Sequence, residues 1–434
     1  MSVTLSDLQW FHSDIQDLKV FAQEGEQKRF LGTLTCHVYQ GSSFQWSEEA
    51  IQRGEEWSPL RMPVQQNICT FADLPHDFNG LPGLFHDSLP DGWGLMVMNR
   101  FLEQINTPLS TITPAVRLSL LGDRSWGSLS FEPECYPIIA QPIGLLDLTK
   151  DVHQLIAGKL PKISPELFLA SSNLHGARPK IAVDLDASDQ ARLSLGAPQP
   201  GFHSWIVKFA AGDEHPDAPL VEQAYMDLAR TMSLNVCDSR IIFLNGRPSF
   251  ATKRFDRING EKQFTHSLSG LLHTTHRQCN LDYTNIGQIL TRLNATEELE
   301  QAFRRACFNV ALSVRDDHSK NISFMKKNGI WCLTPAYDLT YMQGPRGYHF
   351  MNYADCPEQD PTRKFVLQVG INYGLELSRC EDILNEALDI SNQFSSSVKK
   401  YGASKKLTAP IEKRLKQLCK NLRPLTVAAP KRSV

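Results

Sequence analysis

Two hydrophobic patterns divide the chain near residue 260. Before that point, short apolar runs typical of β-strands alternate with turns, as in DLKVFAQ (17–23), KIAVDL (180–185) and SWIVKFA (204–210). From about residue 266 onward, most of the sequence has the 3.6-residue period of amphipathic helices. The chain has 434 residues, enough for two or three domains. The patterns together predict an α+β fold, with an α/β N-terminal region and a mostly α-helical C-terminal region.

Turn-rich segments set the predicted boundaries. The connector EPECYPIIAQPIG (132–144) contains three prolines, which favours a seam between subdomains. We therefore expect an N-terminal α/β subdomain over residues 1–135, a second strand-rich region over 145–257 and a helical region over 258–434. One hairpin should interrupt the helices, because ISFMKKNGIWCL (322–333) joins two apolar runs through Asn-Gly, a strong hairpin signal.

Composition limits the class of protein. The net charge of −2 provides no chain-wide attraction to nucleic acid. The ten cysteines are scattered without a CxxC pair, which argues against a zinc ribbon and favours a reducing compartment. The first residues, MSVTLSDLQW, lack a signal-peptide pattern, and no apolar run is long enough to cross a bilayer. We expect a cytoplasmic protein without membrane association.

The stretch RDDHSKNISF (315–324) concentrates ionisable side chains beside an apolar run. Asp316 and Asn321 have the spacing of the protein-kinase catalytic loop, R-D-x-x-x-x-N, and Asp338 follows the expected hairpin. Asp316 would orient or deprotonate an attacking hydroxyl. Asn321 and Asp338 would offer the oxygen ligands that Mg²⁺ requires. The alternative is a solvated helix end capped by Asn321.

A lysine and a glutamate upstream supply further parts of such a site. Lys208 lies inside the apolar run SWIVKFA, where an ammonium group needs an anionic partner. It would bind the α- and β-phosphates of ATP, with Glu222 on the following predicted helix as its ion-pair partner. The alternatives are an edge-strand lysine that reaches water and a surface glutamate near a helix N-terminus.

Two more segments complete the order of parts. Gly176, Arg178 and Lys180 form a loop before a strand, where backbone N–H groups can face phosphates, although an ordinary turn has the same appearance. We expect IIFLNGRPSFATKRF (241–255) to form a hairpin. Its last residues, 253–255, lie where the hinge of a kinase contacts adenine, although Phe255 also fits a plain core position. The order predicts a bilobal kinase-like fold, in which 145–257 binds ATP and 258–434 carries the catalytic loop.

The sequence resembles the HipA family, the serine/threonine-kinase toxins of bacterial type II toxin–antitoxin modules. The resemblance covers nearly the whole chain, and DxHxKN followed by PxYD is specific to that family. The motifs that carry it are DSLPDGWG (87–94), GDRSWGSLSFEP (122–133), GARPK (176–180), WIVKF (205–209), KRFDR (253–257), DDHSKN (316–321) and PAYD (335–338).

The resemblance implies a set of site residues. Asp316 would be the catalytic base, with Mg²⁺ on Asn321 and Asp338. The residues implied at ATP are His175, Gly176, Ala177, Arg178, Pro179, Lys180, Lys208, Lys253, Arg254, Phe255, His318, Ser319, Lys320, Asn321, Tyr337 and Asp338.

The resemblance also implies partners. The protein substrate would carry the target serine, typically on an aminoacyl-tRNA synthetase, and its phosphorylation would cause growth arrest and persistence. A HipB-like helix-turn-helix antitoxin dimer would bind this chain and operator DNA, with the chain as co-repressor. Two alternatives remain: a catalytically silent binding module of the antitoxin–DNA complex, and a kinase of a small molecule or lipid.

One position departs from the family pattern. Relatives are inactivated by autophosphorylation of a loop serine, often three residues before the loop glycine, and that position here is Asn173. Ser172 and Ser171 are the nearest hydroxyls, and Ser172 is the expected site. A phosphoserine would place nearly two negative charges beside amides that bind ATP, which would favour ejection of the loop.

The C-terminal end is strongly basic. From Ser395 onward there are eleven Lys and Arg residues and one acid, Glu412. Ile411, Leu415, Leu418 and Leu422 have the spacing of a buried helical stripe. A solvated basic helix is one interpretation. The other is contact with phosphates of DNA held by the antitoxin, through Lys399, Lys400, Lys405 and Lys406.

Overall fold

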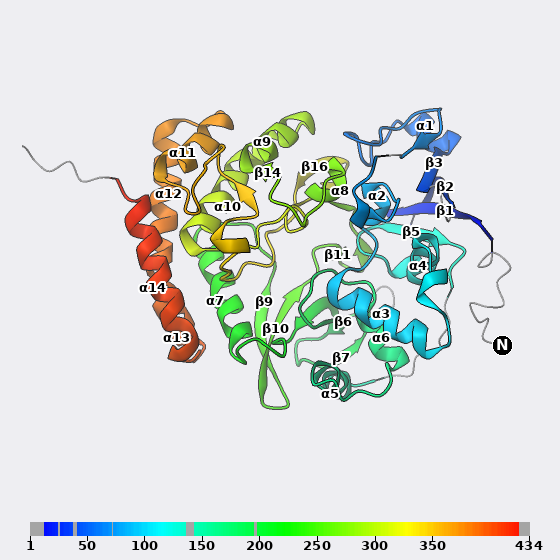
Figure 1. Cartoon of the computed structure of the whole chain (residues 1–434), viewed down its shortest axis with the longest axis horizontal. Helices are drawn as coiled ribbons and strands as arrows, with labels where there is room; N and C mark the ends of the chain where they lie inside the picture. Colours follow the sequence, from blue (N-terminus) through cyan, green and yellow to red (C-terminus); the bar gives the residue numbers. More distant parts are fainter. Residues whose placement is uncertain are drawn as a thin grey trace, which may run out of the picture. The chain divides into compact units, whose positions relative to one another are not determined.

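The computed structural model describes residues 13–24, 27–37, 41–71, 73–135, 143–194 and 198–424. The chain forms two compact units, and each unit is built from three separate segments of the sequence, which can be followed by colour in Figure 1. Unit 1 contains residues 1–223, 237–277 and 319–335, and unit 2 contains 224–236, 278–318 and 336–434. The middle of the predicted connector (136–142) and the predicted basic residues after 424 lie outside the described residues.

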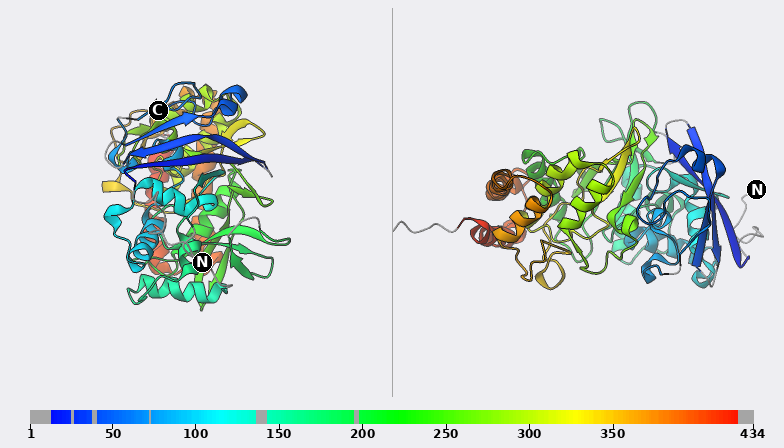
Figure 2. Two further views of the ribbon diagram at one scale, coloured as in Figure 1. Left: turned by 90° about the vertical axis from the view of Figure 1, so that its right-hand side faces the viewer. Right: turned by 90° about the horizontal axis from the view of Figure 1, so that it is seen from above.

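Unit 1 begins with a five-stranded antiparallel sheet in the order β4-β3-β2-β1-β5. Its strands are β1 (Ile15–Glu24), β2 (Gln27–His37), β3 (Gly41–Trp46), β4 (Cys69–Thr70) and β5 (Leu129–Glu132), of which β1–β3 lie side by side in Figure 2. Leu18, Val20 and Ala22 of β1 are fully buried while Lys19 is exposed. This two-residue alternation packs one face of the strand against the core.

Within the described part of the first 223 residues there are six α-helices, and a seventh starts there. They are α1 (Glu48–Arg53), α2 (Gly83–His86), α3 (Gly92–Gln104), α4 (Pro114–Leu121), α5 (Leu145–Ile156), α6 (Pro165–Ser171) and α7 (Ala218–Thr231), which continues into unit 2. Two of them begin as the sequence would favour. Thr113 and Ser164 each accept a backbone N–H at the N-cap, and a proline follows in the first turn.

A second five-stranded sheet carries three of the predicted site residues of unit 1, namely Lys180, Lys208 and Lys253. Its order is β7-β6-β8-β10-β9, with β6 (Lys180–Leu185), β7 (Ala191–Leu193), β8 (His203–Lys208), β9 (Ser239–Leu244) and β10 (Arg247–Lys253), all paired antiparallel. The β9–β10 turn has positive φ at both Asn245 and Gly246. That geometry requires the Asn-Gly pair, so the predicted hairpin is confirmed.

The hairpin predicted within the helical region is also confirmed. β15 (Ser323–Lys327) and β16 (Ile330–Leu333) pair across Asn328 and Gly329, both with positive φ. β13 (Thr265–Ser267) adds a third strand, followed directly by α8 (Leu268–Leu272). The short strands β11 (Arg257–Ile258) and β12 (Glu261–Lys262) form a separate pair.

Unit 2 is mostly helical, as the sequence predicts. Its helices are α9 (Tyr283–Arg292), α10 (Leu299–Leu312), α11 (Arg363–Asn372), α12 (Leu377–Asn392), α13 (Phe394–Lys400) and α14 (Lys405–Leu422), with one parallel pair, β14 (Leu281–Asp282) and β17 (Met351–Asn352). α10 is buried on all sides from Ala302 to Leu312 and packs against α9, α11, α12 and α14. A helix enclosed in this way forms the core of the unit.

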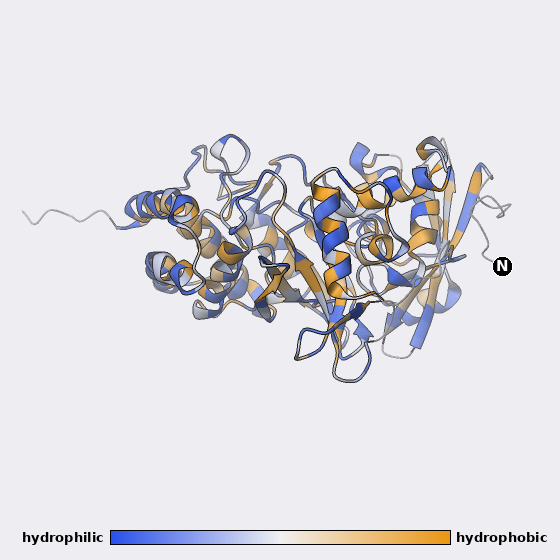
Figure 3. Cartoon of the chain, turned by 90° about the horizontal axis from the view of Figure 1, so that it is seen from below, coloured by the Kyte–Doolittle hydropathy of each residue, from blue (hydrophilic) through white to orange (hydrophobic). Residues whose placement is uncertain are grey.

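The C-terminal helix has the predicted stripe. Ile411, Leu415, Leu418 and Leu422 are all buried, and polar residues cover the other side of the helix (Figure 3). None of the helices in the described ranges is long and apolar enough to cross a membrane. None of the ten cysteines, all within the described residues, forms a disulfide, and most are buried.

Candidate active site

Lys208 and Glu222 form the ion pair that the sequence predicts within unit 1. Lys208 ends β8, and its Nζ donates to Oε1 of Glu222 on α7 at 2.6 Å. The two side chains are 9% and 4% exposed, so the carboxylate is what makes a buried ammonium tolerable. The second oxygen of Glu222 lies 3.7 Å from the Arg178 guanidinium. One carboxylate therefore orients two cations.

The loop before β6 brings further positive charge to the same place. Lys180 is the register partner of Lys208 across β6 and β8, so both side chains leave the same face of the sheet. Nζ of Lys180 donates to the carbonyl of His175 at 2.5 Å and closes the loop around Gly176, whose φ is +89°. Arg178 also pairs with Glu214 at 2.8 Å. The loop thus combines cations with a glycine backbone conformation suited to anions.

The predicted autophosphorylation serines are enclosed at the end of α6. Ser171 and Ser172 are fully buried, and the Ser171 hydroxyl donates to the Lys180 carbonyl at 3.2 Å. Asn173, where the family resemblance led us to expect a serine, donates to the carbonyl of Arg124 at 2.7 Å. Phosphorylation of Ser172 or Ser171 would require this segment to leave its place, so both sites stay predictions.

The residues predicted at the adenine lie in a cluster of ion pairs and rings. Arg254 makes two hydrogen bonds to Asp256, at 2.9 and 2.7 Å, and its guanidinium lies 5.0 Å from the centre of the Trp126 ring. Burial by itself would raise the pKa of Asp256, but the positive charges of Arg254 and Arg257 outweigh burial and lower this pKa to about 2. The Arg254 side chain is thus bound within unit 1, and its predicted contact with adenine is untested.

The two flanking residues have partners of their own. Lys253 donates to Asp238 at 2.9 Å, and Phe255 is 7% exposed and packs edge-on against Trp126. Phe255 therefore occupies the core position that was its alternative interpretation. Its contact with adenine, and that of Lys253, stay predictions.

In unit 2 the two neighbouring aspartates have opposite environments. Asp316 is 32% exposed, and its Oδ1 lies 3.8 Å from Nε2 of His318. Asp317 is fully enclosed: its carboxylate accepts from the Tyr283 hydroxyl at 2.9 Å, from Nδ1 of His349 at 2.7 Å and from the backbone N–H of Phe350 at 2.8 Å. Asp316 is thus accessible for chemistry, whereas Asp317 holds the loop. Sequence reasoning assigned Asp317 no role.

Arg315, which precedes these aspartates, connects them to the C-terminal helix. Its side chain is almost completely buried and pairs with Asp360, which also pairs with Arg414 of α14. Arg315 further donates to the Ser313 hydroxyl at 3.2 Å. Asp360 was missed because it lies 45 residues away from Arg315 in a segment without a recognisable motif.

The predicted metal ligands come from different units. Asn321 lies in unit 1 just before β15, and Asp338 lies in unit 2 with a φ of +56°. Ala336, two residues before Asp338, donates its N–H to Asn235 at 2.7 Å, which ties PAYD to the end of α7; Tyr337 is half-buried. Asp338 thus adopts the left-handed conformation that aspartate tolerates better than most residues, as Asp189 and Asp355 also do.

The donor set is compatible with a magnesium–nucleotide complex. An amide and a carboxylate are hard oxygen ligands, and Mg²⁺ completes its shell with phosphate oxygens and water. Within the described residues no three His, Cys, Asp or Glu side chains gather as a metal site. Two buried polar atoms in the stretches predicted to bind ATP, 175–180 and 318–321, lack hydrogen-bond partners among the described residues. They are Nε2 of His175 and Oγ of Ser319. A polyphosphate could satisfy both atoms.

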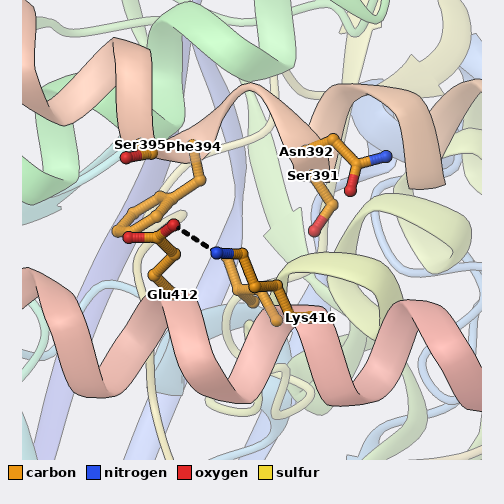
Figure 4. Close-up of a pocket in the computed structure, with 7 residues that line it drawn as sticks. Ser391, Asn392, Phe394, Ser395, Glu412 and Lys416 are labelled. Carbon is orange, nitrogen blue, oxygen red and sulfur yellow. Dashed lines mark ion pairs between the residues drawn. The ribbon is translucent and has the colours of Figure 1, made fainter.

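A small pocket lies elsewhere in unit 2, between the α12–α13 corner and α14 (Figure 4). An ion pair of 2.7 Å between Glu412 and Lys416 crosses its rim. None of the predicted site residues lines it. Its lining residues are Ser391, Asn392, Phe394, Ser395, Glu412, Leu415 and Lys416.

Sequence comparison places this architecture in a family. Residues 172–394 match the family model of the HipA-like C-terminal domain, and residues 19–132 match that of the HipA N-terminal domain. The chain belongs to the HipA family. No curated protein matches the sequence closely enough to count as a relative.

One solved structure confirms the mixed α/β fold. HipA of Shewanella oneidensis MR-1, from a complex titled as a toxin–antitoxin system of HipA, HipB and operator DNA, aligns with a TM-score of 0.68 at 15% identity, covering 93% of this chain and 97% of that one. The Helicobacter pylori proinflammatory kinase CtkA aligns with a TM-score of 0.30 at 12% identity, covering 50% of this chain and 92% of that one. The first of these likenesses establishes a HipA-like fold.

Proposed function

We propose that this protein is a serine/threonine protein kinase that uses ATP and Mg²⁺ and acts as the toxin of a HipBA-type toxin–antitoxin module. The observation that carries the proposal is the buried ion pair between Lys208 and Glu222, beside the loop 175–180. A lysine buried on a strand and held by a glutamate of the next helix is the phosphate-binding arrangement of protein kinases. The family membership of the chain supports the same conclusion.

The residues of unit 1 would bind and orient the nucleotide. Lys208 would neutralise the α- and β-phosphates, because Glu222 pairs with its ammonium and directs it. The loop around Gly176 would offer backbone N–H groups to the phosphates, with Lys180 and Arg178 adding positive charge. These contacts would place the γ-phosphate for transfer without covalent participation of the protein.

The residues of the stretch 315–324, which we call the catalytic segment, would act with Asp338 on the hydroxyl of the substrate serine. The accessible Asp316 would accept the hydrogen bond of the substrate serine and take up its proton as the bond from the serine Oγ to the γ-phosphorus forms. The bond between the γ-phosphorus and the β–γ bridging oxygen would break at the same time, and ADP would leave. Asn321 and Asp338 would hold Mg²⁺, which neutralises charge on the phosphates when it is bound. The rigid pairing of Asp317 would keep Asp316 in place.

The test of kinase activity is transfer of labelled phosphate from ATP. Purified protein with Mg²⁺ should label itself, and in a cell lysate it should label one main protein, which we expect to be an aminoacyl-tRNA synthetase. Asp316→Asn should abolish labelling, and Asp189→Asn, which breaks an exposed ion pair with Arg240, should leave it intact. A wild-type protein that never incorporates phosphate would instead favour the silent binding module.

The basic surface at the C-terminal end supports the partner part of the proposal. Lys399, Lys405 and Lys406 are exposed on α13 and α14, while Lys400 is exposed but pairs with Asp227 at 2.9 Å. In a complex with a HipB-like antitoxin dimer, these lysines would contact DNA phosphates and release counterions.

The salt dependence of operator binding by the complex tests this role. Each lost phosphate contact lowers the slope of log K against log salt by about 0.9. Reversing the charge of Lys399, Lys405 and Lys406 should reduce the slope, whereas reversing the exposed Lys364 on α11 should not. An unchanged slope in the triple variant would remove the DNA role of these residues.

A further inference from the structure

Asp91 joins two loops of the proposed site in unit 1. Its Oδ1 accepts the backbone N–H of Gly176, and its Oδ2 accepts Nζ of Lys320 at 2.8 Å. Lys320 is 7% exposed, so its ammonium depends on this carboxylate. Although burial opposes the charged form, Lys320 and His175 hold the pKa of Asp91 well below its ordinary value. One ionised side chain, that of Asp91, therefore binds both the loop 175–180, through Gly176, and the catalytic segment, through Lys320. We call the loop 175–180 the phosphate loop.

The backbone after Asp91 packs directly against the same loop. The N–H of Trp93 donates to the carbonyl of Gly176 at 3.0 Å. Gly92 has a φ of +43°, and a Cβ there would lie 2.6 Å from the Gly176 carbonyl oxygen. Only glycine permits this approach, since a side chain would push the two backbones apart. The segment Asp91-Gly92-Trp93 thus holds Gly176 at both of its backbone groups: the Gly176 N–H donates to Asp91, and the Gly176 carbonyl accepts from Trp93.

Asp87, at the start of the same motif, holds the other side of the catalytic segment. Its carboxylate accepts from Nδ1 of His266, from the N–H of Ser267 and from the hydroxyl of Ser267, each at 2.7 Å. Those bonds fix the first turn of α8. Its next two N–H groups donate to the carbonyls of Ile322 at 2.8 Å and Ser319 at 3.1 Å. The backbone on both sides of Asn321 is thereby anchored.

Nε2 of His266 also lies 3.0 Å from the hydroxyl of Ser58, which completes a serine–histidine–aspartate chain. Ser58 is fully buried, so its hydroxyl is closed to solvent and to substrate. The chain of hydrogen bonds is thus part of the support for Asp87 and not a nucleophile. It fixes the imidazole in one orientation.

From this geometry we infer that Asp87 and Asp91 are positioning residues for phosphoryl transfer, supplied by the part of the chain that matches the HipA N-terminal domain. The inference rests on the proposed kinase function and adds a role for DSLPDGWG. Neither aspartate needs to touch ATP. Asp91 sets the loop around Gly176 and the side chain of Lys320, and Asp87 sets the backbone around Asn321. The N-terminal domain is therefore part of the phosphate-binding apparatus.

Two substitutions separate the bonds of Asp91. Asp91→Asn keeps an acceptor for the Gly176 N–H but removes the charge that pairs with Lys320, and Asp91→Ala removes both bonds. We expect Asp91→Asn to raise the KM for ATP about tenfold, with a smaller loss of kcat, and Asp91→Ala to raise it further. Asp17→Asn, on the exposed face of β1 beside Thr35, is the matched control and should leave both constants unchanged.

Hydrogen–deuterium exchange without ATP tests the same contacts independently of kinase activity. Asp91→Asn should speed exchange in peptides covering 318–324 while the Gly176 amide stays protected, and Asp91→Ala should speed exchange in both segments. Strand β10 should be unaffected in both variants. A wild-type protein without kinase activity would end the proposed function but leave this exchange result valid.

Three outcomes would overturn the inference. One is an unchanged KM for ATP in Asp91→Ala. Another is unchanged exchange at Gly176 and at 318–324 in that variant. The third is a uniform increase of exchange that includes β10, since this would mean general destabilisation in place of positioning. If Asp91→Ala does not fold, Lys320→Gln breaks the same ion pair from the other side and should raise exchange only in 318–324.

Discussion

Replacing each of two adjacent aspartates by asparagine should have opposite consequences. Asp317 is enclosed by donors, with Tyr283, His349 and the Phe350 N–H within 2.9 Å of its carboxylate. In Asp317→Asn an NH₂ group replaces one carboxylate oxygen and meets either the Tyr283 hydroxyl and Nδ1 of His349 or the Phe350 N–H, all of which donate to the carboxylate in the wild type. The Tyr283 hydroxyl already receives a hydrogen bond from Asn309 at 2.8 Å, so accepting from the new amide as well would leave its own proton without the carboxylate. The variant should therefore lose most of the network.

The expected loss follows from the burial of the charge. Removing one member of a buried, charged hydrogen-bond network costs about 3–5 kcal/mol. For a domain of this size, each kcal/mol lowers the melting temperature by about 2–4 °C, so Asp317→Asn should melt roughly 10 °C below the wild type. Asp316 is 32% exposed, so Asp316→Asn should change stability by less than about 0.5 kcal/mol.

Calorimetric unfolding of the wild type and both variants measures the difference. Labelling with ATP on the same samples completes the comparison, since Asp316→Asn should be stable but inactive. A melting temperature of Asp317→Asn within about 1 °C of the wild type would refute the reasoning, because the buried hydrogen bonds would then contribute nothing to stability. A strongly destabilised Asp316→Asn would contradict its assignment as the accessible carboxylate.

Three other perturbations have defined outcomes. Asp360→Asn leaves two arginines without their shared carboxylate and should lower the unfolding free energy by about 1–3 kcal/mol in thermal melts, unlike Asp382→Asn on the exposed side of α12. Burial, with help from nearby Lys320, lowers the pKa of His86 from 6.5 to about 3. Below pH 6.5 the unfolded chain therefore binds a proton at His86 that the folded chain does not bind. The unfolding free energy measured in urea should fall between pH 7 and pH 5, and this fall should be smaller in His86→Phe. Gly83→Ala would drive a methyl group into the α8 backbone and should cost about 1–3 kcal/mol, whereas Gly212→Ala, with ordinary contacts, should melt as the wild type does.

Some of the fold could be predicted from the sequence because its determinants are local. The Asn-Gly turns at 245–246 and 328–329 adopt positive φ in both hairpins, and that preference belongs to the two residues themselves. The stripe of α14 follows from helical periodicity alone. Lys208 and Glu222 could be paired in advance because a buried ammonium requires a nearby anion, and they are 14 residues apart.

Only the tertiary structure decided which charged residues support the others. The spacing to Asn321 singles out Asp316 locally, but nothing local reveals the role of Asp317, which arises from Tyr283 and His349, 34 and 32 residues away from Asp317. Asp91 meets Lys320 across 229 residues. Local pattern governs backbone conformation, whereas the burial of a charge and its partners depends on segments that the chain brings together only on folding. The sequence therefore determined the elements and the candidate chemistry of this HipA-family protein, and the fold assigned the supporting residues.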